Sequence, residues 1–543
     1  MNATQVLIIG AGPVGLISAL TLAQSNINCL LVDRRETTLD APKAHAVNAR
    51  TLEICQRLGL DADEIRRAGA SIEDGGQVHF VDTLSSTCFG SLPYERQDDG
   101  ALEFTPWPLV NIAQPKFEMF LQAQVNDYPC ITFQRGVTAS DLRQSDTGVT
   151  ATLTDTDGNT LEHHAEYVIA ADGANSRIRE ALDIGMTGPE ALQSNMMIHF
   201  EADLRSLTEN HPGLLYFTLA PDARGVFIGY QRDRTWVFMQ SFDPNTQSRD
   251  DFDDARCQDL VQAAAGSPLP DLQIKNVSPW TMSAQVADSY RSGRVFLAGD
   301  AAHRFPPTGG LGLNTGVADA ENIAWKLSKV LLDKAPAELL DSYEAERRPI
   351  SQINTQQSLA NSAKMMFLFS ALYGPEPAEA AEHYAKVLAD PDAHPALAQA
   401  VEVQRPHFDS FNLQIGYRYG ETVDPDSIDI SHYVPRFEPG DHLPLLPTKG
   451  SPWLLGLVPN NEFALIAGHE GESWRNDVVP VLIDGADFEG RQPFHEWAGL
   501  TSSGALLIRP DGHIAARWIE APTDTACAVE AAHQKALTGQ WGN

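Results

Sequence analysis

Three glycines near the N-terminus have the spacing of a dinucleotide-binding turn. Gly10, Gly12 and Gly15 form a G-x-G-x-x-G pattern directly after a short apolar run. The first glycine allows a tight turn, the second lets a pyrophosphate approach the backbone, and the third lets a helix pack on the strand. The pyrophosphate would meet free N–H groups at the start of that helix, around Pro13 and Val14. The pattern therefore predicts a bound dinucleotide.

An acidic residue stands at the expected distance from this turn. Asp33 ends the next apolar run, 18 residues past Gly15, where a carboxylate can bind a ribose hydroxyl. Arg34 follows it and is a candidate for the same ligand. A glycine-rich turn without any ligand is the alternative, and the combination of strand, helix and acid disfavours it. These residues alone do not separate a nicotinamide dinucleotide from a flavin.

Two later segments favour a flavin. They are Ala171–Arg179, with the letters ADGANSRIR, and Ala298–His303, with the letters AGDAAH. The loop Pro306–Asn314 follows the second segment and combines two prolines with several glycines before a helix. Its N–H groups can face the N1–O2 edge of a flavin and stabilise the negative charge of the reduced form. An ordinary glycine-rich loop is the alternative, which the position directly after the Gly-Asp pair disfavours.

The three motifs, in this order, resemble those of the FAD-dependent single-component (class A) aromatic hydroxylases. The resemblance extends over essentially the whole chain and is strongest to the phenol hydroxylase-like branch, which includes 2,4-dichlorophenol and 2-hydroxybiphenyl hydroxylases. It implies that NADPH or NADH reduces tightly bound FAD and that the reduced flavin forms a C4a-hydroperoxide with O₂. A phenolic ring then takes up oxygen ortho to its hydroxyl group. The nicotinamide cofactor binds transiently in this family, in agreement with the single dinucleotide fingerprint.

The resemblance also implies roles for individual residues. Arg50 and Gln114 match positions that contact FAD, Asp172 lies near FAD and the nicotinamide path, and Asp300 accepts hydrogen bonds from the ribityl hydroxyls. No metal is required. The candidate cofactor-binding residues are Gly10, Gly12, Pro13, Val14, Gly15, Asp33, Arg34, Arg50, Gln114, Asp172, Gly299, Asp300, Pro307, Gly310, Leu311, Gly312, Leu313 and Asn314.

His45 is the first candidate catalytic residue, and Pro307 in the flavin loop is the second. His45 lies five residues before Arg50, in the segment where phenol hydroxylases place a polar residue facing the substrate hydroxyl. Histidine titrates near working pH, so it could orient the phenol or help to remove its proton. A surface histidine in a loop is the alternative. Asn111 stands where relatives carry an acid, which argues against an acid–histidine dyad.

The elements that must position these residues are of the α/β class. The resemblance and the hydrophobic pattern together predict a Rossmann-like FAD-binding domain, an inserted antiparallel-sheet substrate domain and a C-terminal thioredoxin-like domain. Alternating apolar runs within 195–242 predict the antiparallel sheet, and its aromatic residues Tyr216, Phe217, Phe227 and Phe238 are interpreted as core. The expected boundaries are 1–75, 108–185 and 285–400 with a helical extension to about 425 for the first domain, 76–107 and 186–284 for the second, and 435–543 for the third, after a linker near 420–450.

Composition limits the partners and the compartment. The 543 residues include 39 Lys and Arg against 72 Asp and Glu, a net charge of −33, which disfavours nucleic acids and anionic membranes. The apolar stretch 6–32 is interrupted by glycines and Pro13, so no membrane span is expected. Six scattered cysteines without a C-x-x-C pair indicate a reducing, cytoplasmic setting. We expect a small aromatic substrate and O₂ as partners, and a homodimer or higher homo-oligomer.

Other functions remain open from the sequence. A halogenase or dehydrogenase with the same fold is one alternative, although the chain has no W-x-W pair of the halogenase type. A flavin-binding redox sensor or scaffold is another. Within the hydroxylase reading, a larger polycyclic or polyketide-like aromatic ring is possible, because the sequence does not size the substrate pocket.

Overall fold

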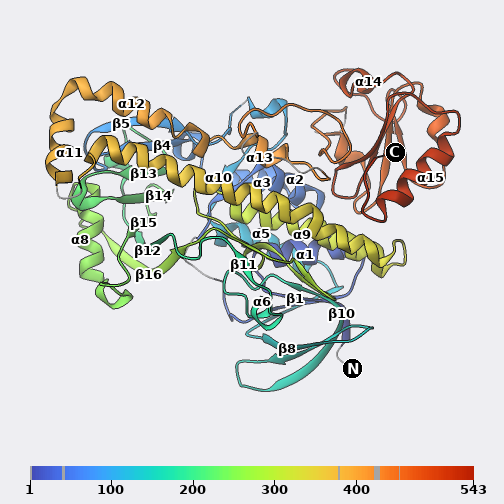
Figure 1. Ribbon diagram of the computed structural model, residues 1–543, viewed down its shortest axis with the longest axis horizontal. Coiled ribbons are helices and arrows are strands. Elements are labelled where there is room, and N and C mark those ends of the chain that lie inside the picture. The colour runs from blue at the N-terminus through green and yellow to red at the C-terminus, as the bar shows by residue number, and fades with distance from the viewer. Residues whose placement is uncertain are drawn as a thin grey trace.

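The computed structural model describes residues 3–38, 43–98, 100–376, 379–420, 428–449, 451 and 453–542. Figure 1 shows an antiparallel sheet at one end of the long axis and a C-terminal α/β unit at the other, with the long helix α10 (Ser342–Tyr373) running between them. A mainly parallel sheet near the N-terminus lies beside α10. Residues 421–427 of the predicted linker lie outside the described residues.

The N-terminal sheet has a parallel core. Its strand order is β18-β19-β10-β1-β2-β7; β19, β10, β1, β2 and β7 run parallel to one another, and β18 is antiparallel to β19. The apolar runs of β1, β2, β10 and β19 are buried on both faces, as expected for parallel strands covered by helices, whereas β7 is only partly buried. The three glycine motifs follow the carboxyl ends of β1, β10 and β19, so they meet at one edge of the sheet, where ligands of such folds bind. The strands are β1 (Ala3–Ile9), β2 (Cys29–Asp33), β7 (Ile131–Arg135), β10 (Thr160–Ala170), β18 (Arg291–Ser292) and β19 (Val295–Leu297).

Helix α9 (Leu311–Leu331) packs against α1 (Pro13–Ala23) beside this sheet. Its first turn overlaps the glycine-rich segment Pro306–Asn314, which the sequence predicts as a loop before a helix. The structure starts the helix at Leu311, and the reason is packing: a Cβ on Gly316 would lie 2.7 Å from the Val14 side chain. The glycine therefore permits close approach to α1 within a helix that tertiary contacts stabilise.

The second sheet has the order β16-β12-β15-β14-β13-β4-β5. The antiparallel pairing predicted within 195–242 is present between β12, β15, β14 and β13. One neighbour differs from a simple meander, since β13 pairs in parallel with β4 from far earlier in the chain. The strands are β4 (Gln77–Val81), β5 (Cys88–Pro93), β12 (Gln193–Glu201), β13 (Leu215–Thr218), β14 (Gly225–Gln231), β15 (Thr235–Ser241) and β16 (Gln273–Met282).

The C-terminal unit is a four-stranded mixed sheet with the order β22-β21-β23-β24 and the helix α15 (Thr525–Ala536). A hairpin turn at Asp511–Gly512 joins β23 and β24, with Gly512 at a φ of +80°. Cys527 is a free, exposed thiol in this unit. The strands are β21 (Ala464–Ala467), β22 (Val481–Ile483), β23 (Ala505–Ile508) and β24 (Ile514–Trp518). With the two N-terminal sheets, this unit confirms the predicted α/β architecture.

The remaining elements connect these units. No helix in the described ranges combines the length and apolar character needed to cross a membrane. The other helices are α2 (Ala49–Arg57), α3 (Ala62–Ala68), α4 (Ile72–Gly75), α5 (Gln114–Asn126), α6 (Arg177–Ala181), α7 (Arg205–Thr208), α8 (Asp254–Ala265), α11 (Ala380–Ala389), α12 (His394–Glu402), α13 (Phe411–Ile415) and α14 (Phe494–Trp497). The other strands are β3 (Ala46–Val47), β6 (Val110–Asn111), β8 (Thr138–Gln144), β9 (Val149–Thr154), β11 (Met186–Thr187), β17 (Gln285–Ala287) and β20 (His303–Arg304).

Candidate active site

The glycines of the first motif differ in what surrounds them. Gly10 has a φ of +105°, and a Cβ there would lie 2.2 Å from the carbonyl oxygen of Ala171. A Cβ on Gly15 would lie 1.8 Å from the carbonyl oxygen of Gly10, so the helix start and the turn touch. A Cβ on Gly12 would meet nothing within 4 Å. Gly12 therefore borders open space at the N-terminus of α1, which is the space that a pyrophosphate requires.

The three motifs lie against one another although they are far apart in sequence. The first touches the second through Gly10 and Ala171. It touches the third through Val14, because a Cβ on Gly299 would lie 2.7 Å from the Val14 side chain. Gly299 itself has a φ of +63°, a conformation that favours glycine. The motifs that the sequence singled out therefore form one continuous wall.

Polar groups follow this wall along β2 and α5. Asp33 is buried, and its carboxylate accepts hydrogen bonds from the backbone N–H groups of Ala11 and Arg35, each at 2.8 Å. Each carboxylate oxygen has a second lone-pair site, so Asp33 retains capacity for a ribose hydroxyl. Arg34 is exposed beside it. Gln114 begins α5 and donates from Nε2 to the Glu118 carboxylate at 2.8 Å.

Two carboxylates near the wall have unused hydrogen-bonding capacity. Asp172 accepts from the backbone N–H of Ile178 at 3.3 Å through Oδ2, whereas its buried Oδ1 has no hydrogen-bond partner among the described residues. Asp300 is exposed, and within the described ranges its side chain makes no hydrogen bond. Lys43, which sequence analysis did not single out, interacts electrostatically with Asp300. These groups suit a ligand that carries both hydroxyl and phosphate groups.

The loop before α9 has the geometry of an anion site. Gly309 and Gly310 have φ values of +111° and +62°, and Gly310 is the N-cap of α9. Pro307 is exposed, and its carbonyl accepts from the Gly310 N–H at 3.2 Å. The first N–H groups of α9, from Leu311 to Leu313, have no intrahelical acceptor and lie at the positive end of the helix dipole.

Asn314 fixes this loop against the segment that carries His45. Its Nδ2 donates to the carbonyl of Ala46 at 3.0 Å, and its Oδ1 accepts from the Asn48 N–H at 3.0 Å and the Thr51 hydroxyl at 2.7 Å. The side-chain amide is therefore occupied by protein partners, and the cofactor contact of Asn314 stays a prediction for the loop backbone. Its observed role is to position the loop relative to His45.

His45 is held by Asn111. The Nδ1 atom of His45 lies 2.9 Å from the amide oxygen of Asn111, and the Asn111 amide nitrogen donates to the Gly75 carbonyl at 2.8 Å. A carbonyl only accepts, so the amide must direct its NH₂ to Gly75 and its oxygen to His45. The Nδ1 atom therefore carries the hydrogen and Nε2 keeps its lone pair. Burial lowers the pKa of His45, which favours this neutral form.

Two tyrosines complete the surroundings of His45. The rings of Tyr94 and Tyr230 have centroids 5.7 and 6.2 Å from the His45 ring. The Tyr94 hydroxyl lies 3.3 Å from the position of a Cβ on Gly310. An imidazole with a free lone pair, two phenol rings and the N-terminus of α9 are therefore neighbours.

Neither tyrosine was identified from the sequence, because the sequence does not show which face of the antiparallel sheet covers His45. Tyr230 lies at the end of β14 and shares its face with Ile228, which packs in the same apolar cluster as Tyr94. Phe227 and Phe238 belong to the cluster on the other face, in agreement with their interpretation as core. Alternation identifies the two faces of a strand, but only the tertiary structure shows which face covers His45.

Arg50, which the resemblance implies as an FAD contact, has several protein partners. Its guanidinium is buried and donates through Nη2 to the Glu321 carboxylate at 2.8 Å and to the Asp511 carbonyl at 2.6 Å, whereas its buried Nε has no hydrogen-bond partner among the described residues. It also lies 2.7 Å from Nε2 of His442. These partners belong to α9 and to the C-terminal part of the chain. Arg50 is thus part of a buried ion-pair network between units, and its contact with FAD stays a prediction.

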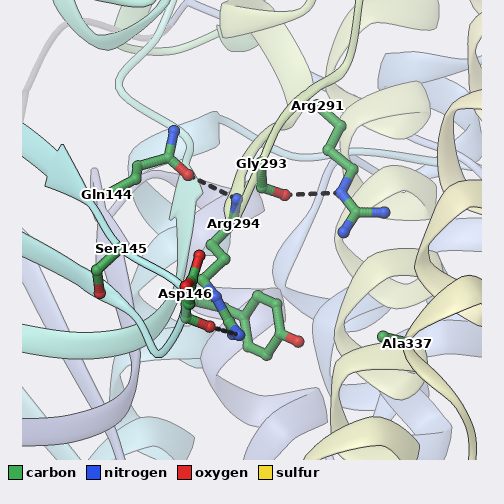
Figure 2. Close-up of a pocket in the computed structure, with 8 residues that line it drawn as sticks. Gln144, Ser145, Asp146, Arg291, Gly293, Arg294 and Ala337 are labelled. Atoms are coloured by element: carbon green, nitrogen blue, oxygen red, sulfur yellow. Dashed lines mark hydrogen bonds between the residues drawn. The ribbon is translucent and has the colours of Figure 1, made fainter.

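A depression of about 500 Å³ lies elsewhere on the molecule. Figure 2 shows Arg291 and Arg294 at its rim, with hydrogen bonds to backbone carbonyls. These residues precede β19, so the depression lies at the amino ends of the parallel strands, away from the glycine motifs. Ligands of open α/β sheets bind at the carboxyl ends, and both guanidiniums are already engaged. The depression is not the active site.

The converging motifs define a flavin-binding oxidoreductase, and comparisons with known proteins agree. The sequence family described as FAD binding domain matches residues 3–358. Aklavinone 12-hydroxylase RdmE of Streptomyces purpurascens is 32% identical over 98% of each chain. The 2,4-dichlorophenol 6-monooxygenase of Cupriavidus pinatubonensis is 27% identical over 99% of this chain and 97% of its own. The crystal structure of the flavin-dependent monooxygenase PieE, with FAD and substrate, matches 99% of both chains with a TM-score of 0.87 and 29% identity.

The chain therefore belongs to the FAD-dependent aromatic monooxygenases, as the motifs predicted, and its cofactor is FAD. The residues present fit this cofactor. The open space at Gly12, the unpartnered oxygen of Asp172 and the exposed carboxylate of Asp300 are observations of this structure that a flavin dinucleotide accounts for together.

Proposed function

We propose that the protein uses NADPH or NADH and O₂ to hydroxylate a phenolic aromatic substrate, ortho to an existing hydroxyl. The observation that carries this proposal is the fixed tautomer of His45, whose Nε2 lone pair is directed away from Asn111 in a setting lined by Tyr94 and Tyr230. A phenol becomes a much stronger nucleophile when it loses its proton. A neutral imidazole beside the phenol hydroxyl supplies the base for that step.

The surrounding residues orient the ring and hold the proton. Asn111 keeps Nδ1–H in place, so the proton from the substrate is taken up at Nε2 and the resulting imidazolium stays hydrogen-bonded to an amide oxygen. Tyr94 and Tyr230 offer aromatic faces for the substrate ring and hydroxyls for its polar substituents. Burial of Tyr94 raises the pKa of its hydroxyl well above the ordinary value, so it stays a neutral donor.

The FAD site is assigned to the wall of three motifs. Gly10, Gly12 and Gly15 hold the pyrophosphate, Asp33 holds the adenosine ribose, and Asp300 holds the ribityl hydroxyls. When bound, FAD supplies the electron transfer from NAD(P)H and the activation of O₂. The N-terminus of α9 contributes N–H donors and a positive dipole end that favour a negatively charged isoalloxazine.

A larger polycyclic substrate is the second candidate, and one observation favours it. Among the full-length relatives, an enzyme named for aklavinone has higher identity to this chain than one named for 2,4-dichlorophenol. A structure of aklavinone-11 hydroxylase with FAD and aklavinone also matches 99% of both chains with a TM-score of 0.81. A polycyclic phenol would use the same base and the same ortho position.

The test measures NADPH and NADH oxidation by the FAD-loaded protein with simple phenols and with polycyclic phenols, assaying hydroxylated product and H₂O₂ together. Product formed nearly one-to-one with oxidised cofactor establishes the hydroxylase and ranks the two substrate classes. Cofactor oxidation that yields only H₂O₂ with simple phenols but product with polycyclic ones selects the second candidate. No stimulation by any phenol contradicts both.

A further inference from the structure

A cluster of metal-ligating side chains lies outside the flavin site. His79 comes from β4, Cys88 begins β5, and His211 lies in the segment before β13. One ligand atom from each of the three lies within 4.8 Å of the others. The β4 strand pairs with both β5 and β13, so neighbouring strands of one sheet bring the three side chains together. No role in the proposed hydroxylation uses any of them.

The hydrogen bonds of His79 place its lone pair on Nδ1, the atom that would bind a metal ion. Its Nε2 lies 2.9 Å from the carbonyl of Pro212, which can only accept, so Nε2 carries the hydrogen. The lone pair is therefore on Nδ1, which accepts from the Ser91 hydroxyl at 2.7 Å. Metal-bound histidines typically donate their second ring N–H to a carbonyl in this way. The Ser91 hydroxyl can rotate to release Nδ1, because it has a single soft torsion.

The other two ligands have the freedom that the site needs. Cys88 is a free, half-buried thiol whose sulfur lies 3.7 Å from the Ser91 hydroxyl, next to Nδ1 of His79. His211 is exposed, so its ring can adjust at little cost. Zinc–nitrogen and zinc–sulfur bonds of about 2.0 to 2.3 Å place ligand atoms roughly 3 to 4 Å apart. Since the ligand atoms lie within 4.8 Å of one another, binding needs a contraction of at most about 1 to 2 Å, within the reach of side-chain rotation.

The donor set selects the class of ion. One thiolate and two imidazoles suit Zn²⁺, Co²⁺ and Cd²⁺, whereas Mg²⁺ and Ca²⁺ require oxygen ligands. The positive charge of Arg232 lies near His79, but Asp74 neutralises it through an ion pair of 2.6 Å.

We propose that His79, Cys88 and His211 form a three-ligand site for a zinc-class divalent ion, with water in the fourth position. The ion ties β5 and the segment at His211 to β4 and so stabilises the antiparallel sheet. It does not take part in hydroxylation, because His79 alternates along β4 with Val78 and Phe80, which pack in the cluster that contains Tyr94. The ion therefore binds on the sheet face opposite His45.

The test titrates the FAD-loaded protein with Co²⁺ and follows the tetrahedral d–d bands in the red, where oxidised flavin does not absorb. We expect one Co²⁺ per chain, displaced by Zn²⁺. Cys88→Ser should abolish the tetrahedral spectrum and His211→Ala should weaken binding at least tenfold, as loss of a metal contact typically does. Cys527→Ser is the control, since it removes a different free thiol, which is exposed on α15, and it should bind as the unmodified protein does.

The flavin spectrum reports whether each variant is folded. Absence of a tetrahedral Co²⁺ spectrum in the unmodified protein overturns the proposal, as does an unchanged spectrum in Cys88→Ser or His211→Ala. If Cys88→Ser does not retain flavin, His211→Ala decides alone, because an exposed histidine can be removed without disturbing the core. Loss of the signal in Cys527→Ser assigns the metal to α15 and also overturns the proposal.

Discussion

At the scale of single residues, the position of one hydrogen atom decides what His45 can do. The Asn111 amide is oriented by Gly75, and the histidine tautomer follows from the amide. An aspartate at position 111 would interact with the same Nδ1–H but would add a negative charge. This chain therefore positions the imidazole with an uncharged partner, which leaves the pKa of His45 under the control of burial.

The pH dependence of kcat/KM should distinguish an uncharged partner of His45 at position 111 from a charged one. Burial lowers the pKa of His45 below its ordinary value of about 6.5, and protonation removes the base, so activity should fall only on the acid side of that value. In Asn111→Asp the carboxylate favours the imidazolium, so the acid limb should move up by about 1 unit or more.

His45→Ala should retain FAD and lose roughly 10²- to 10⁴-fold in kcat. An acid limb that stays in place in Asn111→Asp, or unchanged kinetics and coupling in His45→Ala, would remove His45 from the mechanism.

Two glycines of the first motif should respond in opposite ways to alanine. Gly12 has a φ of −75° and open space around its Cβ position, so Gly12→Ala should leave the unfolding temperature of the apoprotein unchanged. It should weaken FAD binding at least tenfold, about 1.4 kcal/mol, because the methyl group occupies the pyrophosphate space. Gly15→Ala should instead destabilise the apoprotein, since its Cβ would overlap the Gly10 carbonyl. Fluorescence titration with FAD and thermal unfolding separate the two effects, and equal FAD affinity in Gly12→Ala would contradict the assignment.

Sequence predicts residues of this site well where the reason is local. The roles of Gly10 and Gly15 follow from backbone geometry within one turn, and the structure has the predicted contacts. Arg50 has partners as distant as Asp511, so no pattern around position 50 indicates that it joins two units. Tyr230 is an alternating strand residue like its neighbours, and its position near His45 depends on how the sheet covers the site.

At the scale of elements, the segment after β5 connects the antiparallel sheet to α13. Glu95 has a φ of +53°, and its buried carboxylate accepts from the Ser410 N–H, the Ser410 hydroxyl and the Gln414 amide. It directly follows Tyr94, so it fixes the backbone next to a residue of the proposed substrate site. Burial outweighs these donors and raises the pKa of Glu95 to about 7. Sequence did not indicate this connection, because its two ends are far apart in the chain.

This carboxyl group should make stability depend on pH. Its folded pKa of about 7 exceeds its ordinary value of 4.5, so the folded state binds a proton more tightly than the unfolded state between these values. The contribution of Glu95 to the free energy of unfolding should therefore fall by about 3 kcal/mol from pH 4.5 to 7. The glutamine in Glu95→Gln cannot titrate. The difference between the two proteins in the free energy of unfolding, measured in urea, should therefore change by about 3 kcal/mol over this pH range. A difference that is constant across this range would show that the group is not protonated in the folded state.

At the scale of the whole molecule, the C-terminal unit is docked through buried charges. The turn between β23 and β24 places Asp511 against Arg509 at 2.6 Å and against the indole N–H of Trp325 in α9 at 3.2 Å. Arg509 also pairs with Glu346 of α10 at 2.8 Å. The side chains of all four residues are almost fully buried. Because α9 begins at the flavin loop and α10 spans the molecule in Figure 1, this turn contacts the elements that position the cofactor.

Asp511→Asn should therefore destabilise the whole protein. The pKa of the Asp511 carboxyl group lies well below its ordinary value, because the interactions with Arg509 and His513 outweigh the effect of burial. Removing its charge leaves the buried side chains of Arg509 and His513 without this charged partner, which costs about 3 to 5 kcal/mol in comparable cases. We expect a lower unfolding temperature and faster loss of FAD on dilution. Lys449→Ala is the control, because it removes an exposed ion pair with Glu489, worth about 0 to 1 kcal/mol. If Asp511→Asn lowers stability but leaves FAD retention unchanged, the C-terminal unit is anchored by this turn without supporting the flavin site. If both remain unchanged, the buried charges do not hold the units together.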